Sequence, residues 1–132
     1  MGKIAEFMLK QHGEILVLLN NFDKSRNLDD FQKLREKQEN HMYAEEQAIF
    51  VFYAKRKNFP VLMKILQQHE LLEKYLQAIQ KDLKRSIEDY KSLMKEHVAL
   101  EDTKFYPLLD HDLTPAEQGD MLIRAKEYIY PK

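Results

Sequence analysis

The chain has 132 residues and a nearly balanced charge, with 21 lysines and arginines against 22 aspartates and glutamates. This length suits a single hydrophobic core, so we expect residues 1–132 to form one domain. The charges are spread along the chain, which argues against a nucleic-acid partner. The absence of cysteine excludes disulfides, thiolate nucleophiles and thiolate-bound metals. Any metal ion must therefore be held by nitrogen and oxygen atoms.

The N-terminal segment does not resemble a signal peptide, because Lys3, Glu6 and Lys10 interrupt its apolar residues. No stretch of the sequence approaches the length of a membrane span. We therefore expect no membrane partner and a cytoplasmic location. Two short basic runs, at residues 55–57 and 81–85, coincide with turns predicted below, and we interpret them as solvated ends of helices.

The composition favours an all-α fold. Leucine, lysine, glutamate and glutamine are abundant, whereas only three glycines and four prolines interrupt the chain. No segment alternates between apolar and polar residues like a half-buried strand. The first helix is predicted over about residues 4–22, where apolar side chains recur at helical spacing. His12 lies on the same stripe.

Capping and proline chemistry predict the next two helices. Asn27 suits the N-cap of the second helix, because its side chain can accept a hydrogen bond from a free backbone amide. Pro60 can begin the third helix, since the first turn does not need its missing N–H group. The inner faces predicted for the second and third helices are Leu28, Phe31, Leu34, His41, Glu45, Ala48 and Phe52, and then Leu62, Leu66, His69, Glu73, Leu76 and Leu83.

A fourth helix and a short C-terminal helix complete the predicted fold. Ser86 and Asp89 resemble a capping box that would begin the fourth helix at Ile87, and Pro107 is expected to kink it near its end. Its predicted inner face is Ile87, Tyr90, Met94, His97, Glu101, Phe105 and Leu108. The segment Thr114-Pro115-Ala116-Glu117 is a second capping box that predicts the terminal helix. The expected architecture is an up-down-up-down four-helix bundle followed by this short helix.

An internal repeat divides the chain into two helical hairpins. His41-x-x-x-Glu45-Glu46 and His97-x-x-x-Glu101-Asp102 share a pattern at an offset of 56 residues, and His12 and His69 are offset by 57 residues. Each hairpin therefore supplies one lone histidine and one His-x-x-x-Glu pair. Histidine and glutamate four residues apart lie on one face of a helix, so both side chains of a pair point toward a common centre.

The spacing of the four histidines places them in one layer. In an up-down-up-down bundle, residues on neighbouring helices are level when the turn lies midway between them. The midpoints between successive histidines fall at positions 26.5, 55 and 83. These positions lie close to the turns predicted from Asn27, Pro60 and Ser86. We therefore expect the four imidazoles to meet in one layer across the bundle.

A buried layer of this composition indicates a pair of metal ions. Two carboxylates and four imidazoles in an apolar core would carry a large desolvation cost unless cations compensated it. Nitrogen and oxygen ligands suit iron or manganese, with zinc less favoured for a paired site of high coordination number. Any single histidine of the four would be better explained as an ordinary core residue bonded to the backbone or to a glutamate. For the four together we favour metal.

Glu73 and His111 are the remaining candidates for metal ligands. Glu73 lies one turn after His69 and could add a carboxylate, although this position also fits a solvated helix face. His111 lies well beyond the layer and is expected at the surface. The predicted ligand set is therefore His12, His41, Glu45, His69, Glu73, His97 and Glu101.

The chain resembles the haemerythrin-like family, also called the HHE cation-binding domain, from His12 to Pro107. The residues that carry the resemblance are His41-Met-Tyr-Ala-Glu45-Glu46 and His97-Val-Ala-Leu-Glu101-Asp102, with Phe105-Tyr106-Pro107 downstream. The resemblance implies a non-haem di-iron centre, oxo- or hydroxo-bridged. It further implies that His12 and His41 serve one iron, that His69 and His97 serve the other, and that Glu45 and Glu101 are shared.

The sequence departs from the oxygen-carrying haemerythrins at two positions. The carriers have a further histidine where this chain has Glu73, and typically an aspartate at wider spacing where it has Glu101. The resemblance therefore favours the broader di-iron group, which handles oxygen, nitric oxide or iron. Repair of damaged iron centres is not indicated, since the relatives associated with it carry an additional cysteine-bearing segment that this chain lacks.

Several functions remain open from the sequence. The first is a protein that binds or senses a small diatomic ligand, oxygen or nitric oxide. The alternatives are an enzyme that acts on oxygen, peroxide or nitric oxide, in which Tyr43, Tyr75, Tyr90 or Tyr106 could donate protons, and an iron store or donor. The Glu-x-x-His motifs of ferritin-like oxidases are absent. A purely structural adaptor would be favoured only if the protein held no metal.

Overall fold

The computed structural model describes residues 2–54 and 60–130, and this part of the chain is helical and contains no β-strand. The elements in chain order are α1 (Lys3–Ser25), α2 (Leu28–Ala44), η1 (Glu45–Phe50), α3 (Val51–Ala54), α4 (Pro60–Lys81), α5 (Glu88–Leu100), η2 (Glu101–Phe105), α6 (Tyr106–Asp112) and α7 (Pro115–Ile129). The elements η1 and η2 are π-helical. None of the described helices is long and apolar enough to cross a membrane.

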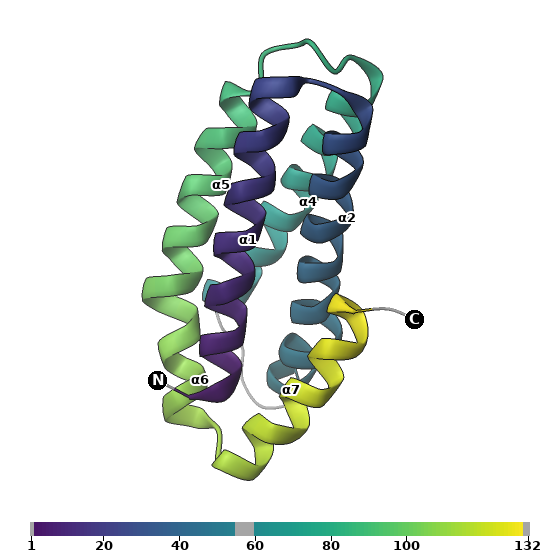
Figure 1. The fold of residues 1–132 in the computed structure, drawn as a ribbon. Coiled ribbons are helices and arrows are strands. Elements are labelled where there is room, and N and C mark those ends of the chain that lie inside the picture. The colour runs from purple at the N-terminus through teal and green to yellow at the C-terminus, as the bar shows by residue number, and fades with distance from the viewer. Residues whose placement is uncertain (1, 55–59, 131–132) are drawn as a thin grey trace.

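The four long helices lie side by side, and the C-terminal helix folds back against them (Figure 1). α1 packs against α2, α4 packs against α5, and α7 contacts both α1 and α2. The capping box predicted for α7 is confirmed: Thr114 Oγ1 accepts from the N–H of Glu117 at 3.1 Å, and Glu117 Oε1 accepts from the N–H of Thr114 at 2.9 Å.

The turn between α1 and α2 lies where the sequence predicts it. α1 extends three residues past the predicted end, and Arg26 caps it in the left-handed conformation with φ 54°. The Asn27 side chain accepts a hydrogen bond from the N–H of Asp30 at 2.8 Å, which confirms it as the N-cap of α2. The Arg26 guanidinium also donates to the carbonyls of Leu83 and Arg85, at 3.3 and 2.7 Å. This side chain therefore ties the α1–α2 turn to the α4–α5 turn.

The turn before α5 is in the predicted place, but its predicted cap is wrong. Ile87, not Ser86, is the N-cap of α5, and no side chain caps the helix. Ser86 Oγ accepts only a long bond of 3.4 Å from the N–H of Glu88. Because the Ile87 side chain is buried in the core, packing sets the start of this helix. Pro60 begins α4 as predicted, whereas the basic run at 55–57 and the preceding midpoint lie outside the described residues.

The π-helical elements change the register of both His-x-x-x-Glu helices. A π-helical turn holds one residue more than an α-helical turn, so the side chains beyond it move around the helix. Tyr53 is therefore buried where Phe52 was predicted, and Leu109 where Leu108 was predicted; Phe52 and Leu108 are half-buried. The departure from α-helical geometry begins at Glu101, and Pro107 lies in the first turn of the α6 helix that follows. The kink at Pro107 stays a prediction.

One more predicted core position is wrong. Leu28 is 44% exposed, because it is the first residue of α2 and lies at the end of the helix. The buried apolar residues pack in two clusters. The first includes Met8, Ile49, Ile65 and Phe105, and the second includes Ile15, Phe31, Leu72 and Tyr90. His12 falls between Met8 and Ile15 along α1, so the histidine layer lies between two apolar clusters.

The N-cap of α2 offers a test of this local structure. Replacing Asn27→Ala removes the hydrogen bond to the Asp30 amide and should lower the free energy of unfolding by about 1 kcal/mol. Chemical denaturation followed by circular dichroism measures the change. Asn20→Ala, on the exposed face of α1, is the matched control and should cause no loss. Equal stabilities for the two variants would contradict the capping role.

Candidate metal centre

Six of the seven predicted ligands lie in one buried cluster. Each is at most 4% exposed, and together they come from α1, α2, η1, α4, α5 and η2. They are His12, His41, Glu45, His69, His97 and Glu101. The structure therefore brings together both halves of the internal repeat.

The four imidazoles present Nε2 to the two carboxylates. Glu101 Oε1 lies 2.9 Å from Nε2 of His12, 3.0 Å from that of His97 and 3.7 Å from that of His41. Glu45 Oε1 lies 3.1 Å from Nε2 of His41 and 3.4 Å from that of His69. The rings are also close, with centroids 4.8 Å apart for His12 and His41 and 5.0 Å apart for His69 and His97. All donor atoms therefore point into the same small volume.

Several of these atoms have no hydrogen bond, although they are buried. They include Nε2 of His69 and of His97, Oε1 of Glu45 and Oε2 of Glu101. Leaving a buried polar atom without a partner costs about 1–3 kcal/mol, so folded proteins generally avoid it. These atoms are the ones that a metal ion would take as ligands. The residues present therefore fit a bound cation.

The donor atoms form two groups in which each residue offers one atom within 4.8 Å of the others. One group is His12, His41 and Glu101, and the other is Glu45, His69, His97 and Glu101. Glu101 belongs to both groups. The two groups of donor atoms are therefore joined through the Glu101 carboxylate.

The π-helical elements begin at the two glutamates of the cluster. The N–H of Glu45 is shared between the carbonyls of His41 and Met42, and the N–H of Glu101 is shared in the same way between those of His97 and Val98. π-Helical turns are rare and are frequent at functional sites. Both halves of the repeat therefore depart from α-helical geometry at the equivalent residue.

The acid that follows each of these glutamates contacts the lone histidine of the other hairpin. Nδ1 of His12 lies 2.9 Å from Asp102 Oδ1, and Nδ1 of His69 lies 3.2 Å from Glu46 Oε2. The remaining contact of this kind joins Nδ1 of His97 to Gln68 Oε1 at 2.9 Å. A histidine that binds metal through Nε2 carries its hydrogen on Nδ1, and an acceptor there fixes the orientation of the ring. Glu46, Asp102 and Gln68 are placed for this role.

The electrostatics of the cluster favour charged forms. Burial lowers the pKa of His12, but hydrogen bonds to Asp102 and Glu101 outweigh it and raise the pKa to about 10. Burial also lowers the pKa of His69, but contacts with Glu45 and Glu46 outweigh this effect and raise the pKa to about 10. Burial raises the pKa of Glu101, but the charge of His97 and several hydrogen bonds hold it well below its usual range. Protons and metal ions compete for the same imidazole atoms, so a bound cation must displace these protons.

Tyr106 places a hydroxyl group at the centre of the cluster. Its oxygen lies 3.2 Å from Nε2 of His12 and 3.4 Å from Nε2 of His41, and it is also 3.4 Å from carboxylate oxygens of Glu45 and Glu101. Burial raises the pKa of the Tyr106 hydroxyl well above its usual range, so this group keeps its proton. Of the four tyrosines considered in the sequence, this one has its hydroxyl among the ligand atoms.

The structure does not bring Glu73 into the cluster. Its carboxylate accepts a hydrogen bond from Arg35 Nη2 at 3.1 Å and is 29% exposed, because the side chain extends from α4 toward α2. His111 lies at the surface, as expected, with its side chain 85% exposed.

The sequence did not single out the residues around the ligands. Glu46 and Asp102 were visible as part of the repeated motif, but an α-helix would not show that both consecutive acids face inward. Gln68 and Tyr106 carried no distinguishing signal. Glu46 and Asp102 could have been identified from the sequence, because an acidic residue follows the motif glutamate in both copies of the repeat.

The family model of the hemerythrin HHE cation-binding domain matches the chain over residues 3–109. The chain belongs to this family. The match covers α1 to α6 and includes all six clustered residues. No curated protein and no solved structure matches the chain significantly. This hemerythrin-family chain thus combines a cation-binding fold with a buried His/Glu cluster suited to metal.

The contact between His12 and Asp102 gives a testable consequence. Asp102→Asn keeps the size of the side chain but removes its charge, so it should weaken metal affinity by about 10- to 100-fold. Competition with a chelator of known affinity measures the effect. Glu96→Gln, on the exposed face of α5, removes the same charge and should leave the affinity unchanged. An equal loss in both variants would attribute the effect to general charge and contradict the orienting role.

Proposed function

We propose that this hemerythrin-family chain binds two iron ions between its four long helices, arranged as an up-down-up-down bundle. The observation that supports the proposal is the convergence of four imidazole Nε2 atoms on two buried carboxylates, several of them without hydrogen bonds. His12, His41 and Glu101 would hold one ion, and Glu45, His69, His97 and Glu101 the other.

The choice of iron rests on the donor atoms and on the charge. Imidazole and carboxylate ligands suit iron, and the chain has no thiolate that would favour a softer ion. Two divalent ions exceed the charge of two carboxylates, which leaves room for an oxide or hydroxide bridge. Glu73 as a seventh ligand stays a prediction that requires its carboxylate to leave Arg35.

We further propose that the centre binds or senses oxygen or nitric oxide. A pair of iron ions supplies the open coordination positions and the electrons that such ligands require. The chain contributes the surroundings: Glu46, Asp102 and Gln68 orient three of the imidazoles. The two apolar clusters on either side of the layer exclude water. A cytoplasmic location remains part of this proposal.

A second candidate function is supported by Tyr106. A protonated hydroxyl within 3.4 Å of both carboxylates can donate a proton to a ligand bound at the centre. Such a donor suits an enzyme that turns over oxygen, peroxide or nitric oxide. The geometry equally allows the hydroxyl to stabilise a bound ligand without reaction.

Metal analysis combined with visible absorption tests the proposed function. The purified protein should hold two iron ions per chain, and the spectrum of the reduced protein should change when oxygen or nitric oxide is added. A reversible oxygen adduct would support binding or sensing, and steady consumption of oxygen or peroxide would support the enzyme. A protein purified without metal would overturn both.

Loss of single ligands tests the assignment of residues. His41→Ala and Glu101→Ala should each lower the iron content by at least half, because each removes a buried donor atom from the cluster. Elemental analysis of the purified variants measures the loss. His111→Ala is the matched control, since His111 lies at the surface, and should retain the full iron content. Unchanged iron in the first two variants would contradict the assignment.

The hydroxyl of Tyr106 distinguishes the two candidate functions. Tyr106→Phe keeps the ring and removes the proton donor, so an enzyme should lose about 10²- to 10⁴-fold in turnover while retaining its iron. A binding protein should instead show faster dissociation of its oxygen adduct. Stopped-flow absorption measures both. No change in either quantity would exclude a role for the hydroxyl.

A further inference from the structure

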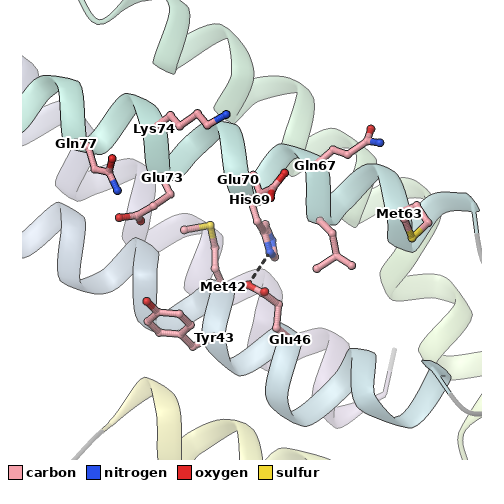
Figure 2. A pocket seen from close by; sticks show the side chains of 11 residues that line it. Met42, Tyr43, Glu46, Met63, Gln67, His69, Glu70, Glu73, Lys74 and Gln77 are labelled. Atoms are coloured by element: carbon pink, nitrogen blue, oxygen red, sulfur yellow. Dashed lines mark hydrogen bonds and ion pairs between the residues drawn. The ribbon is translucent and has the colours of Figure 1, made fainter.

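A groove between α2 and η1 on one side and α4 on the other borders the His/Glu cluster at His69. Its volume is about 750 Å³, and its lining residues are Met42, Tyr43, Glu46, Met63, Leu66, Gln67, His69, Glu70, Glu73, Lys74 and Gln77. Figure 2 shows His69 extending from α4 toward Glu46 on the opposite wall. Two predicted ligands, His69 and Glu73, line this groove, and of these His69 belongs to the buried cluster. Its Nε2 lies 3.4 Å from Glu45 Oε1. The inner end of the groove is therefore one side chain away from the ligand atoms.

The lining of the groove is partly apolar and partly acidic. Met42, Met63 and Leu66 provide apolar surface, and the unbranched methionines can change conformation easily. Three carboxylates, Glu46, Glu70 and Glu73, line it against a single ammonium group, that of Lys74. Arg35 neutralises part of this charge through its pair with Glu73. When His69 is a neutral metal ligand, the three carboxylates outnumber Lys74 and Arg35 by one charge. The lining is then negative, so it disfavours anions and admits neutral molecules and cations.

On the basis of the proposed function, we propose that this groove is the passage by which small molecules reach the metal centre, and that its acidic lining selects neutral and cationic molecules over anions. Nitric oxide and oxygen are neutral and fit this selection. A second cavity, of about 230 Å³, lies against the opposite part of the cluster and is lined by Leu9, Asp102 and Tyr106, among others. It is the competing entrance, and it is about one third of the size.

The absence of cysteine from the chain allows the groove to be closed chemically. Leu66→Cys introduces a single thiol into the groove, which a bulky disulfide-forming reagent blocks and a mild reductant releases. Leu9→Cys does the same in the competing cavity, and Val17→Cys on the exposed face of α1 is the surface control. If Leu66→Cys disturbs folding, Met63→Cys, at a position that is 54% exposed, replaces it.

The rate of nitric oxide binding to the reduced, iron-loaded protein is measured before and after blocking. We expect the block at position 66 to lower the association and dissociation rates together, by at least about tenfold, because a passage controls access and leaves affinity unchanged. Release of the block should restore both rates. Blocks at positions 9 and 17 should have no effect. Slowing by the block at position 9, or no slowing at position 66, would overturn the passage.

Charge selection is measured by thiol labelling of the metal-loaded protein, in which His69 is a neutral ligand and does not carry the proton that it holds without metal. The quantity measured is the labelling rate of a cationic thiol reagent divided by that of an anionic one. This ratio should be on the order of tenfold higher for Met63→Cys than for Val17→Cys. Salt should reduce the difference between the two sites. Adding Glu70→Gln should lower the ratio, whereas Glu96→Gln should not. Equal ratios at the two sites would overturn the selection. Iron-free protein would overturn the proposed function itself, whereas iron-loaded protein with unaffected rates would overturn the passage alone.

Discussion

The burial of two carboxylates among four imidazoles is the constraint on which the rest of this structure depends. Glu45 and Glu101 are fully buried, and a charged group in that position is costly unless it is compensated. Protonated histidines provide part of the compensation, as the raised pKa values of His12 and His69 show. Metal ions would provide it more completely. The two apolar clusters on either side then keep water from a layer that would otherwise be solvated.

Much of the fold follows from local sequence signals. The cap at Asn27, the start of α4 at Pro60 and the capping box at Thr114 are determined by side chains next to the backbone they bond, so sequence alone predicts them. The start of α5 depends instead on the burial of Ile87, which requires the packed neighbours. The π-helical elements were not predicted, because the helical period was assumed to be uniform, and the positions of Tyr53 and Leu109 follow from them.

The site shows the same division. The clustering of six residues could be predicted, because the internal repeat and the even spacing of the histidines constrain their relative height along the helices. The contacts of Glu46 and Asp102 with histidine Nδ1 atoms could not be predicted, because they depend on the local geometry that turns two consecutive acids toward the cluster. Tyr106 reaches the cluster from a position beyond η2, where the register has already shifted. Glu73 shares the helical face of His69 but pairs with Arg35, and this competition is visible only in three dimensions.

The contacts of the cluster cross between the two hairpins. His12 of the first hairpin contacts Glu101 and Asp102 of the second, and His69 of the second contacts Glu45 and Glu46 of the first. Each group of donor atoms therefore draws on both halves of the chain. Neither half contains a complete group, so on the proposed function the two halves expressed as separate peptides would bind metal only by associating. Metal binding would therefore indicate that the two halves of the chain have associated.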